Sequence, residues 1–243
     1  MWSEQQPDWR NKESYAYTVN LTRLGWAWEF LRRNPRFQAD VRQELPAGDG
    51  GRRNDLRRWG VLRADTPSKN AHDAKVFWDP NACSHVLPLL AAHSAVPVSR
   101  DRLISGRVSH VLICDGGRRL QLSVRICAVP KPENLLTEAI VGPTESACRW
   151  RTLICFNEYL YSGHLPWRHF RSERTAGRLA HVAQALDGAL SNASHREIAI
   201  ALYGRVRVSD GWNDPGEYLR DGVRRALRRG RLLMTGGYRH FLR

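Results

Sequence analysis

The apolar residues of the first 45 positions follow a helical pattern. One set recurs at the i, i+3, i+4 and i+7 spacing that lines a single face of a helix: Leu24, Ala27, Trp28 and Leu31. Pro35 interrupts this helix, and we expect Asn34 to cap a second helix that begins at Pro35 and extends through Val41. The indoles of Trp26 and Trp28 are either packing groups or base-stacking surfaces, and packing is the expectation.

The middle of the chain alternates between apolar and polar residues, as a β-strand does. Two runs rich in Val, Leu and Ile stand on either side of Asp115-Gly116-Gly117, and glycines between alternating runs predict a β-hairpin because they adopt positive φ. The second run places Leu120, Leu122, Val124 and Ile126 on one face and Arg119, Gln121, Ser123 and Arg125 on the other. We therefore expect an antiparallel strand with one solvated face. The stretches AKVFWDP, 79–90 and VPVSRDRLI are expected to form shorter strands or helical turns.

The last hundred residues return to helical periodicity. Residues 146–162 and 178–190 each predict one helix. The sequence Ser194-His195-Arg196-Glu197 is a capping box that starts another helix, which Gly204 ends. A second start signal follows, with Asp214 expected as the cap of a helix whose apolar face carries Leu219, Val223, Ala226 and Leu227. The opposite face of that helix is basic and carries Arg220, Arg224, Arg225, Arg228 and Arg229.

These patterns predict an α+β fold with short N-terminal helices, a β-rich middle that contains an antiparallel hairpin, and a helical C-terminal part. We expect a helical domain at 1–45 and a linker at 46–58, where PAGDGGRRND is rich in Pro, Gly and Asp. The β-rich middle then spans 59–145, and a helical domain spans 146–243.

The charge balance points to a polyanionic partner. The 243 residues contain 38 Lys and Arg against 24 Asp and Glu, a formal net charge of +14. Residues 146–243 account for 17 of the basic and 8 of the acidic side chains, or +9 of that excess. A polyanion is therefore the expected partner of the C-terminal part, and the helix-turn-helix pattern described below specifies double-stranded DNA.

Several classes of protein are disfavoured by what the sequence lacks. No apolar run approaches the roughly 18 residues that a membrane span requires, and the first residues show no signal-peptide pattern. The 5 cysteines form no CxxC pair, which argues for reduced thiols and against a zinc ribbon. We expect a cytoplasmic protein with no membrane association, no metal and no cofactor.

Catalytic motifs are also missing from the sequence. A metal-dependent nuclease site could be assembled from His72-Asp73-x-Lys75, Asp79 and Asp115 only by arbitrary selection. His164 and His169, which flank Pro166-Trp167, are expected to be loop residues and not ligands. We expect no catalytic residue and no enzymatic activity.

The C-terminal pattern S-x-R-E-I-A-x-x-L-Y-G favours a helix-turn-helix. The small Ala199 lets two helices approach closely, and Ile198 and Leu202 are expected to fix their crossing. The later basic helix would lie in the major groove, with Arg220 and Arg224 near base edges. The remaining arginines, Arg225, Arg228 and Arg229, would contact phosphates, and Arg196 would clamp the DNA backbone. The alternative is that this basic helix is only a solvated face.

The connection at 204–213 is long for a helix-turn-helix, which has three or four residues there. Either these residues form a wing-like loop, with Arg205 and Arg207 flanking Val206, or the reading helix is misassigned.

Both ends of the chain resemble a known family. The motifs WRNKESYAY and GWAWEFLRRNP resemble the transcriptional-regulator-like N-terminal domain of activators carried by proteobacterial integrative and conjugative elements. The motifs AQALDGALSNASHREIAIALYG and YLRDGVRRALRRGRLLMTGGYRHFLR resemble their helix-turn-helix-like C-terminal domain. The resemblance implies a DNA-binding switch for excision and transfer genes, and a small anti-activator as a further partner.

Two other functions stay open at this point. The C-terminal helices could form a protein-interaction module that binds a partner of the same fold, or the chain could be a nuclease of the mobile element. Charge reversal of the arginines separates DNA binding from protein interaction, and metal-dependent strand cleavage identifies a nuclease. A homodimer is expected, because a single helix-turn-helix unit rarely gains enough affinity alone.

Overall fold

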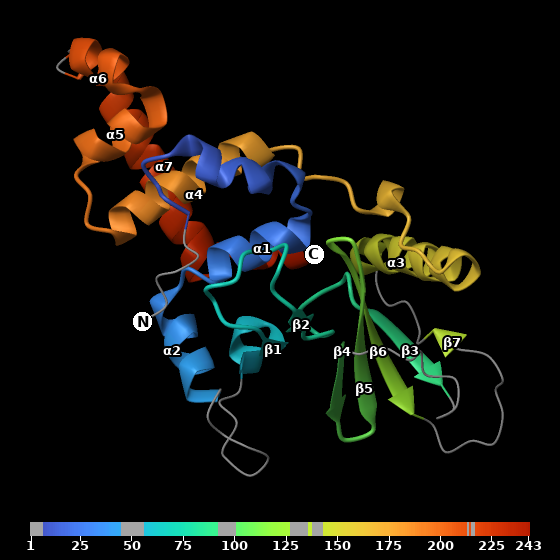
Figure 1. Cartoon of the computed structure of the whole chain (residues 1–243). Coiled ribbons are helices and arrows are strands. Elements are labelled where there is room, and N and C mark those ends of the chain that lie inside the picture. The colour runs from blue at the N-terminus through green and yellow to red at the C-terminus, as the bar shows by residue number, and fades with distance from the viewer. Residues whose placement is uncertain are drawn as a thin grey trace.

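A computed structural model describes residues 7–44, 56–91, 101–126, 136–137, 143–212, 214 and 217–243. Helices form the beginning and the end of the chain, and two sheets lie between them (Figure 1). The predicted α+β class is therefore confirmed. Most of the predicted linker, residues 46–55, lies outside the described residues.

The N-terminal helices begin where the sequence predicts. A 3-10 helix, η1 (Lys12–Asn20), precedes α1 (Arg23–Leu31) and α2 (Pro35–Glu44). Asn34 caps α2 because its side-chain oxygen accepts hydrogen bonds from the N–H groups of the second and third residues of that helix, at 2.9 and 3.3 Å. The helix continues to Glu44, beyond the expected end. Trp26 and Trp28 are both fully buried, which confirms packing as their role.

The β-rich middle contains two sheets. Strands β1 (Val61–Ala64) and β2 (Val76–Trp78) pair antiparallel, after the short 3-10 helix η2 (Leu56–Trp59). The larger sheet has the order β4-β5-β6-β3-β7. Its strands are β3 (Leu87–Ala91), β4 (Asp101–Ser105), β5 (Val108–Asp115), β6 (Arg118–Ile126) and β7 (Leu136–Thr137). Within it, β3 runs parallel to β6, and the other pairings are antiparallel.

The predicted hairpin joins β5 to β6. Asp115 pairs with Arg118, so Gly116 and Gly117 form a two-residue turn, and their φ values of +51° and +86° explain why glycine occupies both positions. The predicted solvated face of β6 is wrong at its centre, although Arg125 is exposed as expected. Gln121 and Ser123 are buried, and the Gln121 side chain forms two hydrogen bonds of 2.8 Å with the backbone of Trp78.

Seven further helices make up the C-terminal part that the structure describes. They are α3 (Pro143–Ser162), η4 (Trp167–His169), α4 (Ala176–Leu190), α5 (His195–Tyr203), α6 (Arg205–Gly211), α7 (Tyr218–Thr235) and η5 (Gly237–Leu242). None of these described helices, nor those before them, is long and apolar enough to span a membrane.

Three apolar clusters hold the described elements together. The largest combines the N-terminal helices and η2 with α4, α7 and η5, and within it the rings of Phe30 and Phe241 stack with centroids 6.4 Å apart. A second lies between the five-stranded sheet and α3. The third joins α4, α5, α6 and α7 and includes Trp9 from before η1. Segments from both ends of the sequence therefore share one core.

Candidate nucleic-acid interface

Helices α4 and α5 are joined by a short turn, and the start of α5 is fixed by the predicted capping box. The hydroxyl of Ser194 accepts the N–H of Glu197 at 3.2 Å, and the Glu197 carboxylate accepts the N–H of Ser194 at 2.8 Å. Hydrogen bonds from the backbone and hydroxyl of Ser194 lower the pKa of Glu197, so the cap is formed at neutral pH. Ile198 and Ala199 are buried in the cluster that α5 shares with α4 and α7, while Leu202 is only half-buried.

A single residue, Gly204, separates α5 from α6. Its φ of +88° ends α5 abruptly, and residues 205–211 then form a helix and not a wing-like loop. Val208 anchors this helix in the core, whereas Arg205, Val206 and Arg207 are exposed. Helices α5 and α6 form one extremity of the molecule, which we call the α5–α6 tip (residues 195–211; Figure 1).

Helix α7 runs from this tip back to the main core. One face is buried along its whole length, through Leu219, Val223, Ala226, Leu227, Gly230, Leu233 and Met234. It packs closely on α4, since a Cβ at Gly230 would lie 3.1 Å from the Cβ of Leu186. The predicted apolar face is confirmed, and it extends further toward the C-terminus than the sequence analysis proposed.

The opposite face of α7 is strongly basic. Arg225, Arg228 and Arg229 are exposed, and Arg231, which the sequence analysis did not single out, is exposed beside them. Its spacing of three residues from Arg228 is the signal that places it there. Within the part of the chain that the structure describes, none of the four forms an ion pair. They leave uncompensated positive charge on one side of the helix.

Arg220 and Arg224 are arranged differently from these four. Arg220 lies 3.3 Å from Glu217, and its guanidinium stacks over the ring of Trp212 at 5.4 Å. Arg224 lies 3.1 Å from both Glu217 and Asp221. The two arginines predicted to reach base edges are thus held in local ion pairs. Such exposed pairs contribute only ~0–1 kcal/mol each, so a phosphate or base can displace them.

The predicted start of α7 is wrong. The helix begins at Tyr218, and its cap residue is Glu217 and not Asp214. Glu217 has a φ of +46°, a left-handed conformation that cannot belong to an α-helix, and its N–H bonds to the carbonyl of Asp214 at 3.0 Å. The α-helix therefore follows Glu217 and not Asp214.

Arg196 occupies the second position of α5 and is exposed. No described residue forms an ion pair with it. Its side chain can therefore contact a ligand beside the turn between α4 and α5, where the sequence analysis expects Arg196 to clamp the DNA backbone.

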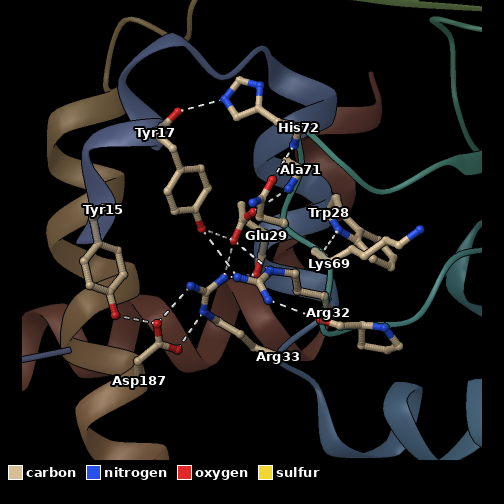
Figure 2. A network of polar contacts seen from close by, with 12 residues as sticks. Tyr15, Tyr17, Trp28, Glu29, Arg32, Arg33, Lys69, Ala71, His72 and Asp187 are labelled. Atoms are coloured by element: carbon tan, nitrogen blue, oxygen red, sulfur yellow. Dashed lines mark hydrogen bonds and ion pairs between the residues drawn. The ribbon is translucent and has the colours of Figure 1, made fainter. Parts of the chain in front are cut away.

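Helix α4, which supports this surface, is held by a buried polar network (Figure 2). The Asp187 carboxylate accepts two hydrogen bonds from Arg33, at 2.7 and 2.9 Å, and one of 2.6 Å from the hydroxyl of Tyr15. Burial, together with the adjacent Asp187 charge, raises the pKa of Tyr15, so the phenol stays protonated as a donor. The helix that carries the tip is therefore bound to the N-terminal helices through charged groups as well as apolar ones.

Glu29 is the other acceptor of this network. It receives hydrogen bonds from Arg32 at 2.8 Å, Arg33 at 2.6 Å and Tyr17 at 2.9 Å, and from the N–H of Ala71 at 2.8 Å. Burial alone would raise its pKa, but the two guanidinium groups outweigh that effect and lower the pKa to about 2. The carboxylate is charged and fully partnered, which is the condition for burying it without large cost.

The residues considered for catalysis do not converge. Lys75 pairs with Asp101 at 2.8 Å, Asp115 pairs with Arg118 at 3.1 Å, and the ring of His72 contacts the carbonyl of Tyr17 at 3.0 Å. His169 contacts Glu158 at 3.1 Å. Among the described residues, no three His, Cys, Asp or Glu side chains gather in a way that could hold a metal ion.

Two family models match the chain. Residues 120–243, slightly more than half of the sequence, match the T6SS (type VI secretion system) transcription factor DNA-binding domain. Residues 8–62 match the proteobacterial transcriptional regulator-like domain. No curated protein and no solved structure gives a significant match. The resemblance of the two ends to a regulator-like domain and a DNA-binding domain is thereby confirmed, and the buried pair of Arg33 and Asp187 joins the two matched segments.

Proposed function

The chain belongs to the family of the T6SS transcription factor DNA-binding domain, and on that premise we propose that it activates the excision and transfer genes of an integrative and conjugative element. The family provides the DNA-binding transcription factor function. Activation, and a mobile element as its setting, follow from the N-terminal and C-terminal motifs, which occur in the order of the two-part activators that they resemble. The division into 1–45, 46–58, 59–145 and 146–243, with DNA bound by the last part, belongs to the same proposal.

The observation that carries the DNA-binding site is the exposed basic face of α7. An amphipathic helix whose apolar side is fully buried can present its other side as a rigid surface. Arg225, Arg228 and Arg229 would contact phosphates, and Arg196 would contact the DNA backbone beside the turn before α5. Arg220 and Arg224 would exchange their carboxylate partners for base edges in the major groove.

The structure also draws attention to the α5–α6 tip. Arg205 and Arg207 are exposed on α6, at an extremity of the molecule that can approach DNA without hindrance from the sheets (Figure 1). We include both residues in the proposed surface, as additional phosphate contacts next to those of α7.

The proposed partners beyond DNA are a second copy of the chain and a small anti-activator of the same fold as the C-terminal helices. In the alternative function these helices bind a protein instead of DNA, and the anti-activator would be that protein. The two functions differ in their dependence on charge, since DNA binding requires the arginines and helix pairing does not.

Fluorescence anisotropy tests the proposal directly. A labelled duplex from the region upstream of neighbouring excision genes is compared with a scrambled duplex of equal length, across about 50–200 mM salt. We expect a preference of about a thousandfold or more that persists at the higher salt. Equal affinities that collapse together as salt rises would reduce the interaction to general attraction for polyanions and would contradict the promoter function.

A further inference from the structure

Helix α3 has two faces, and only one of them is covered by described residues. Its inner face packs on the five-stranded sheet through the buried Cys155 and Phe156. Its outer face carries three large side chains that are about half exposed or more, Trp150 at 52%, Ile154 at 49% and Tyr161 at 86%, and Leu160 is exposed at its edge. Scattered apolar residues are normal on a protein surface, but large exposed apolar side chains gathered on one helix face mark an interaction site.

The spacing along this outer face is that of a coiled coil. Positions 150, 154, 157 and 161 are separated by four, three and four residues, which is the alternation of a and d positions in a heptad. They form one row along the helix, which we call the α3 seam, about 18 Å long at ~1.5 Å per residue. The third position is Asn157.

We propose that the α3 seam pairs with the α3 seam of a second copy of this chain, antiparallel and about a two-fold axis. In this register Trp150 packs against the partner's Tyr161, and Ile154 packs against the partner's Asn157. The two-fold axis repeats both contacts, so all four seam positions are covered.

The residues beside the seam select this arrangement. On one side they are Arg151 and Glu158, and on the other Leu153 and Leu160. An antiparallel pair brings each side against the same side of its partner, so that opposite charges meet on one flank and apolar side chains on the other. A parallel pair would place Leu153 against the partner's Glu158, which is unfavourable. The flanking residues are therefore complementary to one another in the antiparallel orientation only.

The present contacts of the flanking charges leave room for this pairing. Arg151 is exposed, and no described carboxylate lies within ion-pair distance of it. Glu158 contacts Arg168 at 2.7 Å and His169 at 3.1 Å, and its side chain remains 25% exposed. A second arginine can approach a carboxylate of this kind, which accepts several hydrogen bonds. Leu160 is exposed, whereas Leu153 is partly covered by its own core.

The position of α3 fits a dimer that binds DNA. Figure 1 shows α3 on one side of the molecule and the α5–α6 tip on the other, so pairing through α3 leaves both tips free. A seam of this length is too small to bury the area of a standard interface, about 800 Å² per partner. We therefore expect self-association with micromolar affinity, and this affinity should rise when both copies bind one DNA molecule. Only this last step rests on the proposed function, because the pairing itself is measured without DNA.

Sedimentation velocity of the full chain tests the pairing over about 1–100 μM, a range that brackets micromolar affinity. We expect a monomer–dimer equilibrium that Ile154→Glu weakens by at least tenfold. Val19→Glu is the matched control, because Val19 is as exposed as the seam residues but lies on η1. A wild-type chain that stays monomeric throughout this range, or an Ile154→Glu variant that dimerises like the wild type, would overturn the proposal.

Charge exchange tests the orientation. Arg151→Glu should weaken the dimer because two carboxylates then meet, and adding Glu158→Arg to it should restore the wild-type affinity. Failure of the double variant to recover, with circular dichroism showing an intact fold, would overturn the antiparallel register. DNA binding by Ile154→Glu separates the two proposals. If the regulator function holds, the monomeric variant still prefers the duplex from upstream of the excision genes (the promoter duplex) over the scrambled one. Its affinity for the promoter duplex should be lower than that of the wild type.

Discussion

Arg33 and Asp187, which are 154 positions apart in the sequence, form a buried bidentate ion pair with nitrogen–oxygen distances of 2.7 and 2.9 Å. Arg33 follows α1 in the regulator-like segment, and Asp187 lies in α4 of the DNA-binding segment. The two matched segments are therefore parts of one packed unit, and the orientation of α4 depends on the N-terminal helices. A structural change in one segment is therefore expected to alter the structure of the other.

Asp187→Asn removes the charge that compensates Arg33. We expect the free energy of unfolding to fall by about 3 kcal/mol, because a buried guanidinium loses its partner while the packing stays similar. Tyr15→Phe removes only a hydroxyl that donates to the same carboxylate, and should cost about 1 kcal/mol. Urea unfolding followed by circular dichroism measures both. Equal losses for the two variants would show that the ion pair is not the main contact.

The depressed pKa of Glu29 predicts a specific loss of stability in acid. A carboxylate with a folded pKa of about 2 and an ordinary value of 4.5 stabilises the fold fully above pH 4.5, and that contribution disappears as the pH falls toward 2. The wild-type chain should therefore lose stability faster than Glu29→Gln over this window, by up to ~1.4 kcal/mol per pH unit. Unfolding curves at several pH values test this. Parallel pH dependences for the two chains would contradict it.

Gly188 in α4 is predicted to be required by close packing. An added Cβ would lie 2.9 Å from Cγ1 of Ile198 and 3.2 Å from the ring of Trp9. Alanine gains up to ~1 kcal/mol in helix propensity, but overpacking costs about 1–3 kcal/mol, so we expect Gly188→Ala to destabilise the protein.

Gly177 provides a control in the same helix, because nothing lies within 4 Å of its Cβ position. Gly177→Ala should leave stability unchanged or raise it by up to ~1 kcal/mol. The change in melting temperature distinguishes the two variants, and stabilisation by both would refute the packing argument.

Local signals in the sequence predicted much of the fold. Asn34 and Pro35 marked the start of α2, the capping box marked the start of α5, and Gly116-Gly117 marked the hairpin turn. Each of these signals acts over three or four residues, so its physical cause is contained in a short stretch of sequence.

The features that were missed depend on other kinds of information. To predict that this face of β6 is covered, one would have to know that the segment around Trp78 packs on Gln121. Helix α6 was missed because RVRVSDG alternates and contains two valines, a pattern typical of a strand, and tertiary packing of Val208 overrides it. The left-handed conformation of Glu217 has no sequence signal, since positive φ is uncommon outside glycine.

The candidate site was predictable in part. The basic face of α7 follows from helical spacing alone, and the structure places its arginines on the exposed side. The ion pair of Arg224 with Asp221 could also have been anticipated, because a carboxylate three residues earlier lies on the same side of a helix. The residues against which α7 packs could be identified only from the fold.

The most direct test of DNA binding through α7 compares two single charge reversals on the promoter duplex. Arg228 lies in the exposed basic row of α7, and Arg107 is also exposed, without a described partner, at the turn between β4 and β5. Both substitutions to Glu change the net charge by the same amount. We predict that Arg228→Glu lowers the affinity for the promoter duplex at least about tenfold, a loss of ~1.4 kcal/mol, while Arg107→Glu stays within about twofold. Equal effects of the two substitutions would contradict a binding surface on α7.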